Sequence, residues 1–149
     1  MEAPMKRVRV GESRIDRQVL FAAIDLKKGL RIIRYIGEKI SKAESEKRLA
    51  QSNAYIFELN DHYSLDGETI KNTARYINHS CDPNCEVEMI NGAIWIVAIK
   101  DIQEGEELTY NYGYKPDEYE NYPCTCGAKN CCGYIVAQQY RGLIRHKKH

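Results

Sequence analysis

The sequence lacks long apolar runs and has no excess of charge of either sign. No apolar stretch approaches the ~20 residues that span a bilayer, and the basic, polar first residues contain no hydrophobic stretch that could act as a secretion signal. With 22 basic and 21 acidic residues the formal net charge is +1, so no overall field attracts the protein to nucleic acid or to an anionic membrane. We therefore expect an intracellular protein with no membrane and no direct nucleic-acid partner.

Internal repeats and low-complexity tracts are absent as well. The chain has 149 residues, of which 43% are hydrophobic and 29% are charged. A chain of this length and composition forms one domain with a real core, but not two. Its function must therefore fit in one site.

Short β-rich segments separated by turns make up most of the chain. Within residues 19–40, two apolar runs predict two short strands joined by a turn at 27–29. Residues 55–59 and 63–65 predict a strand pair. The polar, basic first dozen residues are expected on the surface or as an added edge strand.

The dipeptide Asn91-Gly92 is the strongest local signal, because it supplies the two positive-φ positions of a type I′ turn between β-rich arms. It predicts a hairpin over residues 87–99. A turn at 104–106 leads into a further predicted strand over 108–112. Residues 114–123 have no apolar period and predict a loop.

Helical signals are few. Ser41 and Glu44 form a capping-box pattern, which predicts one short exposed helix over residues 41–52. Residues 72–78 are long enough for only a helical turn or two. The predicted fold class is therefore mainly β with few short helices.

Cysteine is absent outside two narrow windows. The six cysteines are Cys81, Cys85, Cys124, Cys126, Cys131 and Cys132. In a reducing compartment disulfides are disfavoured, and closely spaced cysteines are better explained as metal ligands. Ordinary buried thiols, or a zinc knuckle with no catalytic meaning, are the alternatives.

A structural zinc ion needs four tetrahedral ligands, and the second window supplies three at close spacing. They are Cys124, Cys126 and Cys131. Cys132 is a doubtful fourth ligand, because the side chains of adjacent cysteines diverge. The first window is the better source, although spacing alone does not choose between Cys81 and Cys85. If the fourth ligand is Cys81, the ion would hold a C-terminal loop against residues 78–80. A structural ion would then help to form a functional site.

Three segments carry a resemblance to a known family. They read ARYINHSCDPNC, GEELTYNYG and PCTCGAKNCCGYI, at residues 74–85, 105–113 and 123–135. In this order and spacing they resemble the signature of SET-domain lysine methyltransferases with a cysteine-rich post-SET tail, and the resemblance extends from Ser13 to about Val136. It implies a fold of small curved β-sheets (a β-clip) with a C-terminal pseudoknot, in which the last strand threads a loop and brings NHSC beside TYNY.

The resemblance also implies how the chain is organised. The parts are an N-terminal segment (1–11), a SET domain (12–114), a post-SET loop with its zinc cluster (115–137) and a basic C-terminal tail (138–149). With no flanking reader module, the chain resembles stand-alone SET proteins of bacteria or viruses. It would be cytoplasmic if bacterial and nuclear if eukaryotic or viral, and the sequence leaves open whether it is a monomer or a dimer.

Site residues follow from the resemblance position by position. Tyr112 corresponds to the catalytic tyrosine, and Tyr110 lies where tyrosine or phenylalanine governs how many methyl groups are added. The residues implied to contact S-adenosylmethionine are Asp16, Gln18, Tyr55, Asn78, His79 and Thr125. The implied ligands of one structural Zn²⁺ are Cys81, Cys124, Cys126 and Cys131. Cys85 and Cys132 have no implied role. A histidine or tyrosine taken alone is more often structural than catalytic, so the assignment depends on their joint occurrence.

One segment departs from the family pattern. Where the family usually carries Gly-x-Gly before the LFA strand, this chain has Arg17 and Val19. Glycines there permit close approach of the backbone to the cofactor, whereas a β-branched valine strongly disfavours positive φ. A weaker hold on the cofactor is therefore expected, partly offset if the Asp16 carboxylate pairs with the ammonium group of the cofactor.

The implied function is methyl transfer from S-adenosylmethionine to the ε-amine of a protein lysine, in a histone tail or another basic protein. Tyr110 predicts mono- or dimethyl-lysine as the product. The alternative is a SET-like, zinc-containing peptide-binding module with weak or no catalysis, which the missing glycines suggest. A zinc-ribbon nucleic-acid binder is disfavoured by the neutral net charge.

Overall fold

Small β-sheets dominate the fold, as the sequence predicts. The computed structural model describes residues 6–12, 18–51, 53, 55–113, 120, 123, 124, 126, 128–137 and 139–140. The strands are β1 (Val8–Glu12), β2 (Gln18–Ala22), β3 (Arg31–Tyr35), β4 (Glu38–Ser41), β5 (Ile56–Glu58), β6 (Tyr63–Asp66), β7 (Asn78–His79), β8 (Cys85–Ile90), β9 (Ala93–Ala98) and β10 (Thr109–Tyr110). The helical elements among these residues include α1 (Lys42–Ala50) and a 3₁₀ turn, η1 (Thr73–Tyr76).

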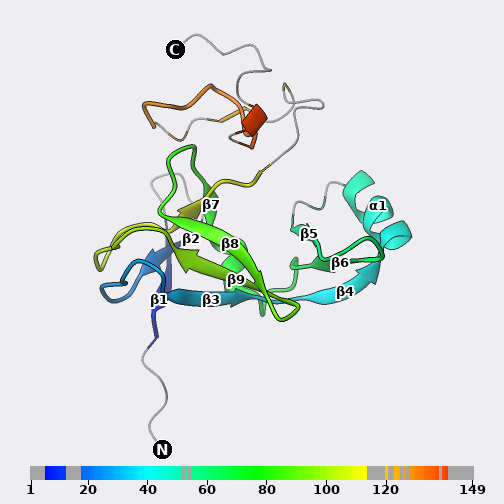
Figure 1. Ribbon diagram of the computed structural model, residues 1–149, viewed down its shortest axis with the longest axis horizontal. Helices are drawn as coiled ribbons and strands as arrows, with labels where there is room; N and C mark the ends of the chain where they lie inside the picture. The colour runs from blue at the N-terminus through cyan, green and yellow to red at the C-terminus, as the bar shows by residue number, and fades with distance from the viewer. Residues whose placement is uncertain are drawn as a thin grey trace, which may run out of the picture.

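The strands of the described chain form two-stranded and three-stranded sheets. Antiparallel pairing builds the sheets β1-β2, β3-β9-β8 and β4-β6-β5, whereas β7 and β10 pair in parallel. Figure 1 shows α1 with β4, β5 and β6 at one end of the molecule and the cysteine-rich C-terminal segment, in orange, beyond β7. The β7-β10 pair therefore lies between the sheets and the cysteine-rich segment.

The hairpin at Asn91-Gly92 forms as predicted. Asn91 has a φ of 51° and Gly92 a φ of 79°, the two positive values that a type I′ turn needs. The turn sets the register of β8 against β9 from Ile90↔Ala93 to Cys85↔Ala98. Asn91 is also the one non-glycine residue with positive φ among the residues described.

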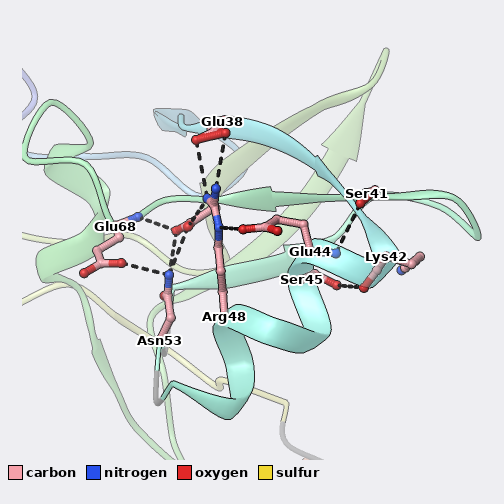
Figure 2. Close-up of polar contacts among 9 residues, drawn as sticks. Glu38, Ser41, Lys42, Glu44, Ser45, Arg48, Asn53 and Glu68 are labelled. Atoms are coloured by element: carbon pink, nitrogen blue, oxygen red, sulfur yellow. Dashed lines mark hydrogen bonds and ion pairs between the residues drawn. The ribbon is translucent and has the colours of Figure 1, made fainter.

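Helix α1 begins at the predicted cap. The Ser41 side chain accepts a hydrogen bond from the backbone N–H of Glu44 at 3.1 Å, which satisfies one of the free amides of the first turn. Figure 2 shows Arg48 pointing from α1 toward Glu38. Its guanidinium donates to Asp66 at 2.7 Å and to Glu44 at 2.9 Å. The pair with Asp66 ties the exposed helix to β6, whereas the pair with Glu44 lies within the helix.

The core is apolar, and it lies under β2, β3 and β9. Its fully buried members include Leu20, Leu26, Tyr35, Ile77, Ile96, Ile102 and Leu108. Gly37 marks a close approach of β4 and β6, since a Cβ there would lie 2.0 Å from the carbonyl oxygen of Asp66. Within the part of the chain that the structure describes, no helix has the length and apolarity to cross a membrane.

The two strands predicted within residues 19–40 form, as β2 and β3. Each pairs with a partner elsewhere in the chain, β2 with β1 and β3 with β9. One local prediction differs from the structure in detail: the strand predicted over 108–112 is only Thr109–Tyr110 in length. It is short because its partner β7 offers only two residues for pairing.

Candidate active site and cysteine cluster

The parallel pair β7-β10 brings two of the sequence motifs together. Its register places Thr109 opposite Asn78 and Tyr110 opposite His79. The backbone N–H of Ser80 extends the pairing by donating to the carbonyl of Tyr110 at 3.2 Å. NHSC and TYNY therefore lie side by side, as the resemblance predicts.

A continuous series of aromatic rings passes through this centre. The ring centroids of Tyr35 and Phe57 are 4.6 Å apart, and those of Phe57 and Tyr110 are 6.2 Å apart. The rings of Tyr110 and Tyr112 follow at 5.0 Å, and those of Tyr112 and His79 at 5.4 Å. Aromatic faces in this arrangement attract cations and exclude water. The rings therefore form one continuous aromatic group through the centre of the fold.

Tyr112 is held from three directions by residues of one short segment. Its hydroxyl donates to the carbonyl of Ile77 at 2.7 Å. Its backbone N–H donates to Nδ1 of His79 at 3.1 Å, and its ring meets the His79 ring at an interplanar angle of 68°. Tyr110 beside it is 6% exposed. The orientation of both tyrosines is therefore set by β7 and by the residue that precedes it.

Tyr55 lies next to β5, and a charged residue covers its ring. The guanidinium carbon of Arg75 lies 4.6 Å from the centroid of the Tyr55 ring. The Tyr55 backbone is fixed by an N–H that donates to the side chain of Asn53 at 2.9 Å and a carbonyl that accepts from the buried hydroxyl of Tyr35 at 2.9 Å. Burial raises the pKa of the Tyr35 phenol above its ordinary value, so this hydroxyl remains a donor.

The predicted cofactor residues are placed unevenly. Asp16, Arg17 and Thr125 lie outside the described residues. Gln18 is exposed at the start of β2. Val19 is 0% exposed and has no positive φ in β2, so a glycine is not needed there for backbone freedom. The side chain of Asn78 donates to Glu107 at 3.4 Å.

The cysteines named by the resemblance converge on one point. Cys81, Cys124, Cys126 and Cys131 have sulfur atoms that all lie within 4.8 Å of one another. Sγ of Cys81 and Sγ of Cys124 are 3.9 Å apart. Four sulfurs at ~2.3 Å around a tetrahedral zinc ion lie ~3.8 Å from one another, so the cluster has the size of a zinc site.

The thiols of Cys81, Cys124 and Cys126 differ in pKa because their surroundings differ. Burial raises the pKa of Cys124 to about 12, and burial together with the Cys124 thiol raises the pKa of Cys81 further. Burial also opposes ionisation of Cys126, but hydrogen bonds from the backbone of Cys81 and Ala128 outweigh it and lower its pKa to about 7. The backbone N–H of Gly133 donates to Sγ of Cys131 at 3.3 Å. A divalent cation would replace the protons that the thiols of Cys81 and Cys124 retain.

The remaining two cysteines lie outside this group. Cys85 is 1% exposed at the start of β8, its thiol donates to Asn84 at 3.3 Å, and burial raises its pKa to about 12. Cys132 is 1% exposed and packs with Val136. The structure thus chooses Cys81 over Cys85, a choice that spacing left open.

Sequence reasoning missed Phe57 and Arg75 as members of the site. Phe57 links Tyr35 to Tyr110, and Arg75 covers Tyr55. Arg75 stands in the segment ARYINHSCDPNC, and Phe57 lies within the longer span that the resemblance covers. The signal that could have found Phe57 is its place two residues after Tyr55, on the same face of a strand.

Comparison with known proteins agrees with this geometry. Residues 17–113 match the SET domain. The chain is 37% identical over 145 residues, 91% of its length, to "Histone-lysine N-methyltransferase, H3 lysine-4 specific" of Schizosaccharomyces pombe. It is 40% identical over 134 residues, 83% of its length, to "Histone-lysine N-methyltransferase trr" of Drosophila melanogaster. It is 37% identical over 158 aligned residues, 99% of its length, to "Histone-lysine N-methyltransferase ATXR7" of Arabidopsis thaliana.

These relatives are much longer proteins. The chain spans 16%, 6% and 11% of their respective lengths. The match to the SET domain covers residues 17–113, which include β7, β10 and all the rings of the aromatic series. The chain therefore belongs to the SET-domain family.

Proposed function

We propose that the protein transfers a methyl group from S-adenosylmethionine to the ε-amine of a lysine in a histone tail. The observation that carries the proposal is the aromatic centre built by β7 and β10, with Tyr110 and Tyr112 5.0 Å apart and His79 5.4 Å beyond. The names of the relatives add the substrate class, and the name of the Schizosaccharomyces pombe protein specifies lysine 4 of histone H3. A histone substrate would place the protein in the nucleus of a eukaryotic cell.

The substrate lysine must reach the site as a neutral amine. A free lysine with a pKa of ~10.4 is only about one part in a thousand neutral near pH 7.4. Desolvation between aromatic rings disfavours the ammonium form, so the pKa of a bound lysine falls without a carboxylate base. The rings of Tyr110, Tyr112 and Phe57 would line this channel, attract the cation by its charge and orient the amine.

Tyr112 has the geometry of the residue that supports transfer. Its hydroxyl donates to the carbonyl of Ile77 at 2.7 Å, which fixes the position of the oxygen. The oxygen still has lone pairs that can accept from a group in the site. Tyr110 would limit the product, since its hydroxyl can hold a water or the amine and so occupy the space of further methyl groups. We propose mono- or dimethyl-lysine as the product.

The residues around this centre suit the cofactor. Nε of Arg75 is buried with no hydrogen-bond partner among the described residues, and its guanidinium lies over Tyr55. A cationic donor beside an aromatic ring suits a molecule that carries both a carboxylate and an aromatic base. Gln18, Tyr55, Asn78 and His79 would hold S-adenosylmethionine, together with Asp16 and Thr125. When bound, it supplies an electrophilic methyl group on a sulfonium.

The cysteine cluster suits a structural Zn²⁺. Four thiols match the donor set of closed, structural zinc sites. The cluster joins Cys81, two residues after His79, to the C-terminal segment. It would hold that segment over the cofactor residues and so close the site.

Radiolabelled methyl transfer tests the proposal. The purified protein with Zn²⁺ is given labelled S-adenosylmethionine and a panel of histones, including histone H3, and the product lysine is identified by mass spectrometry. We expect labelling of a histone, a rate that rises between pH 7 and 9.5, and a loss of at least ~100-fold in Tyr112→Phe. Tyr63→Phe is the matched control, because Tyr63 is 42% exposed and its ring lies against Lys39 and His62.

The alternative function is peptide binding with weak or no catalysis. Calorimetry separates the two. Binding of S-adenosylmethionine together with labelled product supports the enzyme, whereas binding of a histone peptide with neither cofactor binding nor label would show the alternative to be right.

A further inference from the structure

The His79 side chain connects the two halves of the site. Its Nδ1 accepts from the backbone N–H of Tyr112 at 3.1 Å, and its Nε2 lies 3.4 Å from Sγ of Cys81. An amide N–H can only donate, so Nδ1 must present its lone pair and the proton of a neutral ring must be on Nε2. The Nε2–H therefore points at the sulfur, as a donor.

Sulfur accepts such a bond well only when it is ionised. A metal-bound cysteine is a thiolate, and N–H groups that donate to the ligands of a site raise its affinity for the metal and fix the ligand orientation. Cys81 also has its carbonyl fixed, by the side chain of Asn130 at 2.9 Å. The segment from Ile77 to Cys81 is thus anchored to the C-terminal segment at its far end.

The same segment holds Tyr112. Besides the bond to His79, the Tyr112 hydroxyl donates to the carbonyl of Ile77 at 2.7 Å and the two rings are in edge contact. A displacement of Cys81 is therefore transmitted to Tyr112 through the imidazole.

We propose that His79 is a positioning residue that couples occupancy of the cysteine cluster to the placement of Tyr112, with one ring nitrogen on a metal-bound thiolate and the other on the tyrosine backbone. The role of His79 in placing Tyr112 for catalysis rests on the proposed function, whereas its bond to the Cys81 thiolate does not. The side chain of His79 is then engaged by protein on both nitrogens, so its contact with the cofactor is made by the backbone of β7.

Two substitutions separate the two bonds. Counted along the side chain from Cβ, the amide oxygen of Asn occupies the position of Nδ1 and the amide nitrogen of Gln that of Nε2. His79→Asn therefore keeps an acceptor for Tyr112 and loses the donor to Cys81. His79→Gln keeps the donor to Cys81 and loses the acceptor. His62→Asn is the matched control, since His62 is an exposed histidine in the turn between β5 and β6.

The metal half is measured without catalysis. In His79→Asn we expect zinc affinity, from competition with a chromogenic chelator, to fall roughly 10–100-fold, while His79→Gln stays within about threefold of wild type. With Co²⁺ in place of zinc, the sulfur-to-cobalt charge-transfer band should move to longer wavelength in His79→Asn alone, because a thiolate that loses a hydrogen bond gives up its electrons more easily. The His62→Asn protein should match wild type in both measurements.

The catalytic half is measured at saturating zinc. His79→Gln should lower kcat at least ~10-fold with little change in KM for the histone peptide, since Tyr112 loses its placement while the peptide surface remains. His79→Asn should keep most of kcat. Circular dichroism and metal stoichiometry confirm that each variant is folded and loaded.

The outcomes decide between coupling and a merely structural histidine. Equal zinc affinity and identical cobalt spectra in wild type, His79→Asn and His79→Gln would overturn the proposal, as would an equal loss of kcat in both variants. If wild type methylates no histone, the proposed function fails by itself, and the zinc affinities and cobalt spectra still support or overturn the bond between His79 and the thiolate.

Discussion

Replacing Asp66 with Asn should destabilise the protein and loosen the cofactor side of the site. Asp66 is 6% exposed and accepts hydrogen bonds from Arg48 at 2.7 Å, from Asn53 at 3.0 Å and from the backbone N–H of Glu68 at 3.0 Å. Figure 2 shows these groups gathered between α1 and the sheet. Asn53 in turn accepts from the backbone N–H of Tyr55 at 2.9 Å. The network therefore sets the position of a predicted cofactor residue.

The expected loss of stability can be estimated from the interactions of the Asp66 carboxylate that an Asn amide cannot make. An Asn at position 66 keeps one acceptor oxygen, loses the charge, and turns its NH₂ group toward the donors of Arg48 or Asn53. Hydrogen bonds to charged groups contribute about 1.5–3 kcal/mol each, and a buried donor without an acceptor costs a similar amount. We expect a loss of about 2–3 kcal/mol, which for a chain of this size lowers Tm by roughly 5–10 °C.

The loss should depend on pH in a defined direction. Burial raises the pKa of Asp66, but the bonds from Asn53, Glu68 and Arg48 outweigh burial and lower it below the usual value. A carboxyl whose pKa is lower in the folded state stabilises the protein above the unfolded-state pKa of ~3.9, and that contribution disappears as pH falls through the folded-state pKa. The gap between wild type and Asp66→Asn should thus be full at pH 7 and should shrink in acid.

Thermal unfolding of both proteins between pH 3 and 7 measures this gap. Glu58→Gln is the control, because Glu58 is 67% exposed in its ion pair with Lys42 at 3.3 Å, and surface pairs contribute little. A Tm shift in Asp66→Asn no larger than that of Glu58→Gln, or a gap that stays the same down to pH 3, would refute the reasoning.

Three further predictions concern the site. Tyr110→Phe removes the hydroxyl that limits the product, so mass spectrometry should show a move from monomethyl-lysine toward di- and trimethyl-lysine; an unchanged distribution contradicts the assigned role. Excess chelator should lower Tm and abolish methyl transfer, with both restored by Zn²⁺, and unfolding that chelator leaves unaltered would contradict a zinc site. Val19→Gly should cost about 3 kcal/mol, because Val19 is 0% exposed in β2. If that variant binds S-adenosylmethionine more tightly at an unchanged Tm, the structural role given to Val19 is wrong.

Local features were predictable because a few adjacent residues determine them. Asn91-Gly92 supplies both positive φ values of the β8-β9 turn, and Ser41 caps α1 through the amide of Glu44. No residue outside these segments is needed for either structure. Short-range steric and hydrogen-bonding preferences therefore sufficed.

Pairing between distant strands was not predictable from the local pattern. β3 and β9 come together across about sixty residues, and β7 with β10 across about thirty. The apolar alternation of each strand is compatible with several partners. Only the resemblance to the SET-domain family predicted that NHSC would lie beside TYNY, because members of a family share one topology. The roles of Tyr110, Tyr112 and the cofactor residues remain predictions that the experiments above address.

The sequence around Cys85 contains a local pattern that distinguishes it from Cys81 as a metal ligand. In the segment CEVEMI, the buried Cys85 and the half-buried Val87 alternate with the exposed Glu86 and Glu88. Alternation of this kind assigns Cys85 to the inward face of a strand, where pairing with β9 fixes its thiol in the core and burial raises its pKa to about 12. Cys81 precedes the strand, so no sheet register constrains its side chain, and it can turn toward the C-terminal thiols. A cysteine that begins an alternating strand is thus a poor ligand for a metal outside the core, and the cysteine four residues before it is the better one.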